Sequence, residues 1–360
     1  MGFELGTTIG DYQFIDVLES SREETTYKVR NVPAQRYELL RVLGESVQSD
    51  PLRSERFQRE AKILSRLKHP HIVSYCSSAK LDGRFVLATE LVEGANLAER
   101  LEIGRLSLPD SVRIIWQTLE ALECAHGEGV VHRDISPQRI FITPEGEVKL
   151  GGFFLARSTA DPKLTQAGAA VGNAHYMSPE QVQATQDLDP RSDLYSLGVV
   201  FYELVTGSKP FTGDSQFDVM LAQVEKEPMP PSLVDQSIGN ELDPVILKAL
   251  AKKPEDRFQS AGEFREALMG VRLGTTHQAS TDIESALERK RREAKLEQES
   301  AAKRAEALRR AASPEMVSAL SGEALPTPPA PLVSGPLRAL LLFAITAAAC
   351  AIYFWMFALR

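Results

Sequence analysis

The hydrophobic pattern of the chain changes near Gly94, and this change limits the folds that the chain can adopt. Before Gly94, short runs such as Tyr12–Leu18 and Arg36–Leu43 alternate apolar and polar residues, as antiparallel strands do. After Gly94, apolar residues recur at helical spacing. Strands followed by helices predict one mixed α+β domain over residues 10–270.

Individual elements can be placed within this domain. A helix is expected at about Leu52–Leu67, followed by strands at about Ile72–Ser77 and Arg84–Leu91. A long helix is expected around Val112–Cys124. The segment Leu194–Thr206 is apolar nearly all round, which is typical of a helix at the centre of a large lobe.

The composition is that of an ordinary globular protein, with 43% hydrophobic and 25% charged residues. The net charge of -8 gives no reason to expect nucleic acid binding. Cys76, Cys124 and Cys350 are far apart and lack C-x-x-C spacing, which indicates a reducing compartment and argues against a disulfide framework or zinc site. The start of the chain lacks a basic region followed by an apolar run, so no signal peptide is expected.

Residues 271–336 have a different composition. A charged helical segment is predicted at 271–312, with favourable i,i+4 pairs such as Glu288/Arg292. Its apolar stripe is broken, so we interpret it as a solvated single helix, with self-association of residues 282–312 as the alternative. Residues 313–336 are rich in proline and are expected to be a disordered or stiff extended spacer.

A transmembrane helix is predicted at residues 337–359. The run Ala339–Leu359 has 21 residues without charge, which span about 31 Å at about 1.5 Å per residue, against a bilayer core of about 30 Å. A buried core helix is the alternative. Only one residue follows, so we expect a single-pass C-terminal tail anchor with the folded domain in the cytoplasm. Arg338 and Arg360 balance each other and do not orient the helix.

Five motifs stand in a fixed order within residues 10–270, and together they resemble the serine/threonine protein kinases, especially Hanks-type bacterial members with a membrane anchor. The motifs are Arg59-Glu60-Ala61 with His69-Pro70-His71-Ile72-Val73, then Val131-His132-Arg133-Asp134-Ile135-Ser136-Pro137, Tyr176-Met177-Ser178-Pro179-Glu180, Ser192-Asp193-Leu194-Tyr195-Ser196-Leu197-Gly198, and Lys253-Pro254-Glu255-Asp256-Arg257-Phe258. The resemblance implies a bilobal fold, with a small lobe of antiparallel sheet and one helix at about 10–92 and a larger helical lobe at about 93–270.

Kinases hold ATP through metal ions, and the positions that resemble the metal ligands are changed. Where the family carries Asp-Phe-Gly, the chain reads Gly152-Phe153-Phe154, and glycine cannot bind a metal. Arg139 stands where an asparagine would bind the second magnesium. Its charge opposes a metal, although it could attract a phosphate. Ser136 replaces the lysine that would steady the γ-phosphate.

The positions that would hold the rest of the nucleotide are also changed. The three glycine positions of the phosphate loop fall on Glu19, Ser21 and Glu24. The acidic residues there would discourage a triphosphate, and an ordinary solvated hairpin is our structural interpretation. Arg41 replaces the strand lysine and is expected to pair with Glu60. Leu39 would crowd the base pocket, and Thr89 is a further nucleotide-site position by resemblance.

Other family positions are retained. Asp134 matches the residue that would accept the substrate hydroxyl proton. Four residues match the regulatory spine of active kinases: Leu64, His132, Phe153 and Asp193. Glu180 and Arg257 match a buried ion pair of the large lobe. Arg133 could bind a phosphate on the loop 157–178, where the candidates are Ser158, Thr159 and Thr165, or could be a backbone-bonded structural arginine.

The pattern predicts a membrane-anchored pseudokinase that acts as a signalling scaffold or regulator by binding other proteins, such as kinases or their substrates. On this interpretation no cofactor, metal ligand or nucleic acid partner is expected. The alternative is a divergent, weakly active serine/threonine kinase that uses Asp134, for which ATP and Mg²⁺ would be the cofactors. A scaffold that self-associates through 282–312 is a third hypothesis.

Overall fold

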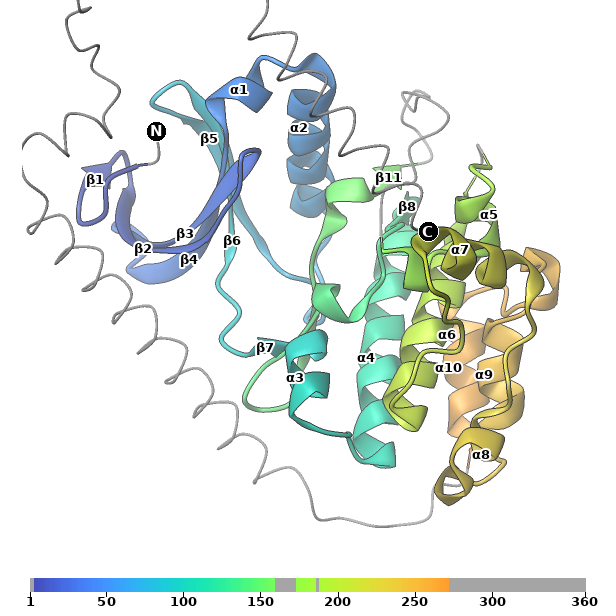
Figure 1. The fold of residues 1–360 in the computed structure, drawn as a ribbon. Helices are drawn as coiled ribbons and strands as arrows, with labels where there is room; N and C mark the ends of the chain where they lie inside the picture. The colour runs from blue at the N-terminus through green and yellow to red at the C-terminus, as the bar shows by residue number, and fades with distance from the viewer. Residues whose placement is uncertain (1–2, 159–172, 186–187, 272–360) are drawn as a thin grey trace, which may run out of the picture. The chain divides into compact units, whose positions relative to one another are not determined.

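The first part of the chain forms a six-stranded antiparallel sheet in the order β1-β2-β3-β4-β6-β5 (Figure 1). The strands are β1 (Thr8–Ile9), β2 (Tyr12–Ser20), β3 (Glu24–Asn31), β4 (Arg36–Leu43), β5 (Tyr75–Leu81) and β6 (Arg84–Glu90). The structure is a computed structural model that describes residues 3–158, 173–185 and 188–271.

The alternation along β4 divides its side chains between the two faces of the sheet. Leu40 and Val42 are buried on one face in a small core with Phe14 and Tyr27. Arg41 points to the opposite face, where it pairs with Glu60 of α2 (Pro51–Arg66). The short α1 (Glu45–Gln48) precedes α2. The expected helix at about 52–67 is therefore present with its bounds shifted by one residue.

The strand predicted at Ile72–Ser77 was placed too early. The observed β5 begins at Tyr75. The preceding residues instead pair with β10 (Val148–Leu150), because Val73 N–H donates to Leu150 O at 2.9 Å and Leu150 N–H donates to His71 O at 2.8 Å. A period-2 pattern cannot distinguish a strand of one sheet from a segment that bridges to the next.

The second part of the chain is mainly helical and forms a second lobe (Figure 1). Its helices are α3 (Leu97–Ile103), α4 (Leu108–Gly127), α5 (Pro179–Val182), α6 (Pro190–Thr206), α7 (Gln216–Glu225), α8 (Pro231–Val234), α9 (Asp243–Ala249) and α10 (Ala261–Met269). Short strands pair as β10-β9-β7, with β7 (Ala95–Asn96) and β9 (Ile140–Ile142), and β8 (Val130–Val131) pairs with β11 (Arg157–Ser158). The 3₁₀ helices are η1 (Pro137–Arg139), η2 (Phe153–Leu155), η3 (Ala174–Tyr176), η4 (Gln236–Ile238) and η5 (Pro254–Asp256).

Helix α6 lies at the centre of this lobe and packs against α4 and α9. Its N-terminus is capped by the Asp189 side chain, which accepts from Arg191 N–H, and Pro190 opens its first turn. Gly207 ends it with φ +73, and Gly207 N–H donates to Glu203 O. The expectation of a helix buried on nearly all sides is confirmed, since most of its side chains are buried.

Three predicted segments lie outside the described residues: the charged helix at 271–312, apart from Val271, the spacer at 313–336 and the membrane segment at 337–359. Of the helices in the part of the chain that the structure describes, none is long and apolar enough to cross a bilayer.

Candidate functional site

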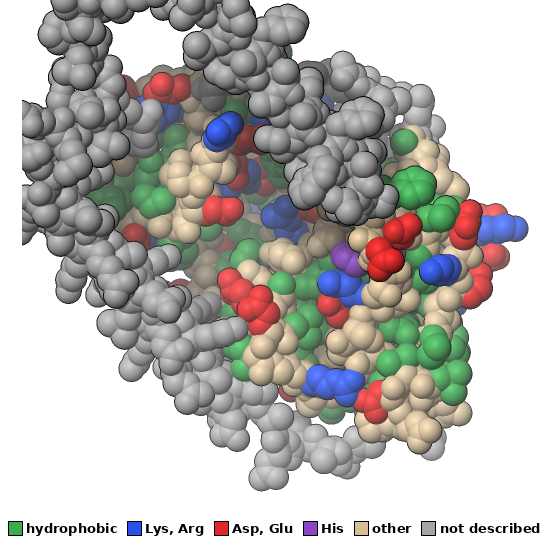
Figure 2. All heavy atoms as spheres, in the orientation of Figure 1, with side chains coloured by type: hydrophobic (Ala, Val, Ile, Leu, Met, Phe, Trp, Pro, Cys, Tyr) green, Lys and Arg blue, Asp and Glu red, His purple; other side chains and the backbone are tan. Residues whose placement is uncertain are grey.

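The two lobes contact each other through α2 and η2, and the site residues singled out in the sequence come from both lobes. The small lobe contributes β4, α2 and the turn between β2 and β3. The large lobe contributes the loop from His132 to η1 and the segment from Gly151 to η2. On the face shown in Figure 2, acidic and basic side chains of the described residues are interspersed, without a continuous basic patch.

The retained acid Asp134 forms an ion pair with Arg139. Arg139 Nε donates to Asp134 Oδ2 at 2.7 Å. The Asp134 side chain is 8% exposed, whereas that of Arg139 is 42% exposed. The guanidinium of Arg139 is therefore already bonded to the carboxylate of Asp134. In an active kinase this carboxylate would have to accept a proton from the substrate hydroxyl.

The side chain of Arg139 also fills the space above Gly152. A Cβ atom at Gly152 would lie 2.4 Å from Arg139 Cδ and 2.9 Å from Arg139 Nε. The backbone of Gly152 is left-handed, with φ +81, which side chains rarely adopt. An acid at position 152 would therefore require the Arg139 side chain to move, so the two replacements noted in the sequence are in contact in the structure.

The donor set at this position does not fit a divalent cation. Magnesium requires several oxygen ligands in near-octahedral geometry. At the two positions that resemble metal ligands the chain offers no side-chain oxygen, since Gly152 has no side chain and Arg139 carries a guanidinium. The nearby carboxylate of Asp134 is already paired with a cation.

Arg41 is held by two carboxylates. Its Nη1 lies 2.7 Å from Glu60 Oε2, so the ion pair expected from the sequence is formed. Its Nη2 also lies 2.7 Å from Glu24 Oε2, a contact that the sequence did not predict. The guanidinium lies near the rings of Phe57 and Phe154, at 5.6 and 5.9 Å from their centroids. Burial lowers the pKa of Arg41, but Glu60 and Glu24 outweigh it and raise that pKa.

In the turn between β2 and β3, backbone N–H groups donate hydrogen bonds to acceptors within the turn itself. Ser21 Oγ accepts from the N–H groups of Glu23 and Glu24, at 3.2 and 3.1 Å. Ser21 N–H donates to Glu24 O at 2.9 Å, and Gly44 N–H donates to Glu23 O at 2.8 Å. These N–H groups are therefore not directed at a phosphate.

The turn is mainly exposed, as expected of a solvated hairpin, but two of its acidic side chains have partners that the sequence did not predict. Glu23 forms an ion pair with Arg53, and Glu24 pairs with Arg41. Both acidic charges are thus offset by arginines that lie far away in the sequence. The acidic side chains and backbone donors of the turn are therefore already engaged by other groups of the small lobe.

The remaining nucleotide-site positions are Leu39, Thr89, Glu19 and Ser136. Leu39 lies opposite Thr89 in the β4–β6 register, with Leu39 partly buried and Thr89 buried. Glu19 is exposed and pairs with Thr26 on β3. Ser136 is buried, and its carbonyl accepts from Arg139 N–H at 3.0 Å. The structure thus places Leu39 and Thr89 together and leaves Glu19 at the outer end of β2.

The predicted spine residues are all buried, and the aromatic rings of two of them are in contact. The rings of His132 and Phe153 are 4.5 Å apart, in an edge-on arrangement. Leu64 is buried in the same core as Phe153. Since η2, which contains Phe153, packs against α2, the helix that carries Glu60 is supported from the large lobe.

Asp193 organises the backbone of the loop that carries Asp134. It accepts hydrogen bonds from His132 N–H and Arg133 N–H, both at 2.8 Å, and faces His126 Nε2 at 2.9 Å. Burial would raise the pKa of Asp193, but these contacts lower it. Arg133 has φ +69, and its carbonyl accepts from Gln181 Nε2 at 2.8 Å. Hydrogen bonds from the backbone of this loop to Asp193 and Gln181 therefore hold the loop in place. They do so independently of any catalytic role of Asp134.

His132 has a defined tautomer. Asp134 N–H donates to His132 Nδ1 at 3.2 Å, so the proton must lie on Nε2, which faces Gly151 O at 2.9 Å. Burial lowers the pKa of His132, which favours the neutral ring that the acceptor role of Nδ1 requires.

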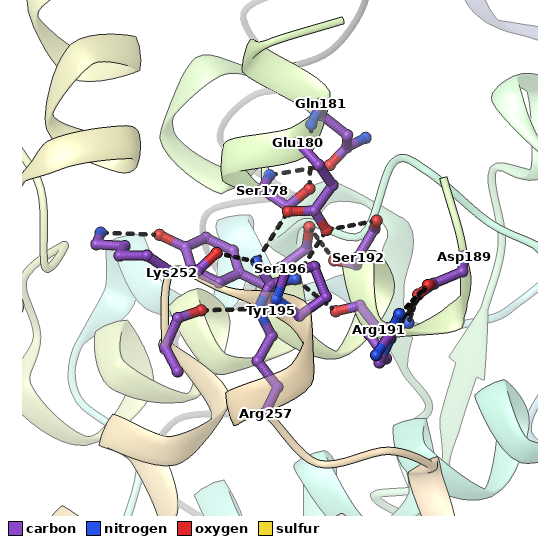
Figure 3. Close-up of polar contacts among 12 residues, drawn as sticks. Ser178, Glu180, Gln181, Asp189, Arg191, Ser192, Tyr195, Ser196, Lys252 and Arg257 are labelled. Carbon is purple, nitrogen blue, oxygen red and sulfur yellow. Dashed lines mark hydrogen bonds and ion pairs between the residues drawn. The ribbon is translucent and has the colours of Figure 1, made fainter. Parts of the chain in front are cut away.

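Glu180 and Arg257 form the buried ion pair that the resemblance predicts (Figure 3). The pair is bidentate, with distances of 2.7 and 2.8 Å, and Ser192 Oγ donates to Glu180 Oε1 at 2.6 Å. The Arg257 side chain is fully buried, and all five of its N–H groups find acceptors. Besides Glu180, the acceptors are the carbonyls of Ala251, Arg191 and Lys252.

Sequence reasoning missed several residues of this site. Glu24 was noted as a missing glycine but not as a partner of Arg41, and His126 was not noted at all. Phe154 was noted as part of the changed Asp-Phe-Gly motif, but its position near Arg41 was not predicted. Of the candidate phosphate acceptors, Thr159 and Thr165 lie outside the described residues.

Comparison with known proteins agrees with this architecture. The sequence matches the protein kinase domain over residues 25–268. PknB, a serine/threonine-protein kinase of Mycobacterium leprae, is 36% identical over 274 residues, which are 74% of this chain and 44% of that protein. A probable serine/threonine-protein kinase of Clostridium perfringens is 34% identical over 262 residues, 72% of this chain and 38% of that protein.

The crystal structure of the Mycobacterium tuberculosis PknI kinase domain is also similar, with a TM-score of 0.59 and 26% identity over 76% of this chain and 100% of that one. The chain spans less than half the length of the two curated relatives named above. The match nevertheless covers most of the chain, including both lobes. The chain therefore belongs to the protein kinase domain family, and its relatives are bacterial serine/threonine kinases of the Hanks type.

Proposed function

We propose that this protein is a pseudokinase, which keeps the kinase fold and works by binding other proteins rather than by transferring phosphate. The observation that carries the proposal is the position of Arg139. Its side chain covers Gly152 and is bonded to Asp134, so one residue fills the metal position and engages the base.

Phosphoryl transfer depends on positioning and on electrostatic stabilisation of the phosphates. In protein kinases two Mg²⁺ ions are held by the aspartate of Asp-Phe-Gly and by an asparagine of the catalytic loop. Gly152 and Arg139 stand at those positions and offer no oxygen ligand. Loss of one preorganised partner typically costs about 10²–10³ in rate, and several such losses do not simply multiply.

The phosphate-binding side of the site supports the same proposal. Arg41 already binds two carboxylates, and the turn N–H groups of Glu23 and Glu24 bond to Ser21. A triphosphate would have to displace Glu24 from Arg41 before it could bind there. Glu24 thus acts as an internal anion that satisfies Arg41.

We further propose that residues 337–359 anchor the protein in a membrane, with the kinase domain in the cytoplasm. The support is the uncharged 21-residue run and its length. Its partners would be other proteins, such as kinases or their substrates. Self-association through residues 282–312 has weaker support, because the apolar stripe there is interrupted by charge.

The proposal is tested by thermal unfolding of the full-length chain with ATP, in Mg²⁺ and in a chelator. A ligand present at about 100 times its Kd stabilises a protein by about 2.7 kcal/mol, which is readily measured as a rise in Tm. We expect no rise that depends on Mg²⁺. A magnesium-dependent rise at micromolar ATP would overturn the proposal.

A divergent, weakly active serine/threonine kinase is the second candidate. It is favoured by the named kinases at 34% and 36% identity and by the retention of Asp134. Sequence similarity to these kinases supports phosphotransferase activity more directly than it supports a scaffolding role. A radiolabelled phosphotransfer assay, with Asp134→Ala as the control, separates the two. Phosphate transfer that disappears in the Asp134→Ala variant would support the kinase hypothesis. Equal phosphate incorporation with both proteins would exclude it.

A further inference from the structure

Helix α7 carries apolar side chains on two opposite faces. Its inner face is buried through Val219 and Ala222, and the helix packs against α5 and η3. Its outer face carries Phe217 and Leu221, which are 68% and 43% exposed. Val224 is partly buried and continues this stripe, since residues 217, 221 and 224 follow the i, i+4, i+7 spacing of one helix face. A surface helix normally has polar residues on its outer face, so the exposed stripe indicates that another element covers it.

Exposed acidic side chains surround this stripe. Asp214 and Asp218 lie near its N-terminal end, and Glu225 and Glu227 lie at and just after its C-terminal end. Lys226 is the one base in the sequence of residues 214–227, so the stretch has a formal net charge of -3, from four acids against one base. All five charged side chains are exposed. A partner of this face should therefore be apolar, with basic residues beside its apolar stripe.

The chain itself contains a segment with this pattern at residues 283–292. Ile283 and Leu287 are four residues apart, so they share one face of the helix that the sequence predicts for this segment. They are followed by four consecutive bases, Arg289-Lys290-Arg291-Arg292. The segment lies outside the described residues, and its spacing and charge are read from the sequence alone.

We propose that segment 283–292 docks as a helix on the outer face of α7 within the same chain. The two patterns match in one parallel register, in which the apolar pair of the segment faces the exposed apolar pair of α7. Glu225 follows Leu221 by four residues, and Arg291 follows Leu287 by the same four. This register therefore sets a base beside an exposed acid at the end of the apolar stripe.

The chain between α10 and the segment is long enough for this contact. The described residues end at Val271, 12 residues before Ile283. Twelve extended residues span up to about 43 Å, which is comparable with the diameter of a lobe of this size. A short flexible tether also keeps the effective concentration of a segment near the millimolar range. Docking can therefore be populated even when the contact itself is weak.

A second copy of the protein and a membrane surface fit this face less well. Pairing α7 with α7 of another copy would bring together two stretches that each carry a net charge of -3, which electrostatic repulsion disfavours. Anionic lipid headgroups would be repelled for the same reason. The basic run at 289–292 has the opposite charge and belongs to the same chain.

The docked segment would close the outer face of α7 to other proteins. Because exposed charges contribute to the contact, it should weaken as salt rises, since the Debye length falls from about 10 Å at 0.1 M to about 3 Å at 1 M. The inference does not depend on whether the protein transfers phosphate.

Disulfide trapping in the full-length chain, in detergent micelles, tests the proposal. The trap is the double variant Leu221→Cys/Leu287→Cys, and its matched control is Leu233→Cys/Leu287→Cys. Leu233 lies on α8 and is 70% exposed, so a thiol there is at least as accessible as one at position 221. After mild oxidation, mass spectrometry identifies the linked peptides, including any that contain the natural cysteines. We expect the trap to close at least about tenfold faster than the control, at a rate independent of protein concentration.

Charge variants test the role of the basic run. Adding Arg289→Glu/Arg291→Glu to the trap should slow its closure at least about fivefold, and so should salt at about 1 M. The matched variant Arg309→Glu/Arg310→Glu makes the same change of charge outside the segment. It should leave the rate unchanged within a factor of about two.

The proposal is overturned if the trap closes no faster than the Leu233 control, since an undocked tether would reach both positions alike. It is also overturned if the link joins two chains at a rate that rises with protein concentration, because a second copy would then be the occupant. Equal rates for the two charge variants would overturn it as well, because recognition would then not involve the basic run.

Discussion

Arg139 and Gly152 come from different loops, and the structure brings them into contact. The stem of Arg139 lies where the side chain of residue 152 would begin. A glycine with φ +81 tolerates this arrangement, and other residues would be strained. A larger side chain at position 152 would therefore meet both backbone strain and the stem of Arg139.

The first prediction concerns this pair. Gly152→Ala should destabilise the protein, by about 1–3 kcal/mol from the left-handed backbone alone and by more from the collision with Arg139. In an Arg139→Ala background the collision is absent, so the cost of Gly152→Ala should fall. Urea unfolding of the four proteins gives the coupling, which we expect at about 0.5–3 kcal/mol. Strictly additive effects would show that the two side chains do not compete for space.

The chemical types at these positions could be predicted from the sequence, whereas the contacts could not. Resemblance placed Gly152 and Arg139 at metal positions, but nothing in the chain indicated that Arg139 bonds to Asp134. Side-chain direction depends on the backbone of η1 and on the space that Gly152 leaves free. For the same reason Glu24 was interpreted only as a replaced glycine of the phosphate loop, and its ion pair with Arg41 was not predicted.

At the scale of elements, Arg41 joins three parts of the small lobe: β4, α2 through Glu60, and the turn through Glu24. The two carboxylates differ in environment. The Glu60 side chain is 2% exposed and that of Glu24 is 31% exposed. A buried partner is costly to remove, and a more exposed one contributes little.

The second prediction follows from this difference. Glu60→Gln should destabilise the protein by about 3 kcal/mol, since it breaks a buried pair and loosens α2. The matched variant Glu24→Gln should cost at most about 1 kcal/mol. Hydrogen exchange should then show faster opening of α2 in the first variant and of residues 19–26 in the second. Equal costs would indicate that Glu60 is not the main partner of Arg41.

Element types were largely predictable, and element boundaries were less so. The central helix α6 could be recognised because it is apolar nearly all round and ends at a glycine. The strand before β6 was misplaced, because residues 71–73 bond to β10 in the other lobe. That partner is distant in the sequence, and a local pattern contains no information about it.

At the scale of the whole molecule, buried groups with lowered pKa values should make stability depend on pH. Burial lowers the pKa of His132, and pairing with Arg257 lowers the pKa of Glu180 despite the opposing effect of burial. A group whose pKa is lower in the folded state binds protons more readily when unfolded, so it stabilises the fold at high pH and loses this contribution as pH falls.

The third prediction is therefore a two-step loss of stability in acid. His132 should contribute a decline that begins below about pH 6.5, the ordinary histidine pKa. The buried carboxylates should add a second decline below about pH 4.5. Urea unfolding between pH 8 and pH 3 measures both. A free energy of unfolding that stays constant from pH 7 to pH 5 would contradict the neutral, buried state of His132.

The central claim is that the site cannot hold a divalent cation beside a triphosphate, and calorimetric titration of ATP into the full-length protein tests it most directly. The titration is done with Mg²⁺ and with a chelator, on the natural chain and on the double variant Arg139→Asn/Gly152→Asp, which restores both ligand types. The natural chain should give the same heats in both buffers, and the double variant should gain a magnesium-dependent signal. Micromolar ATP binding by the natural chain that requires Mg²⁺ would contradict the claim.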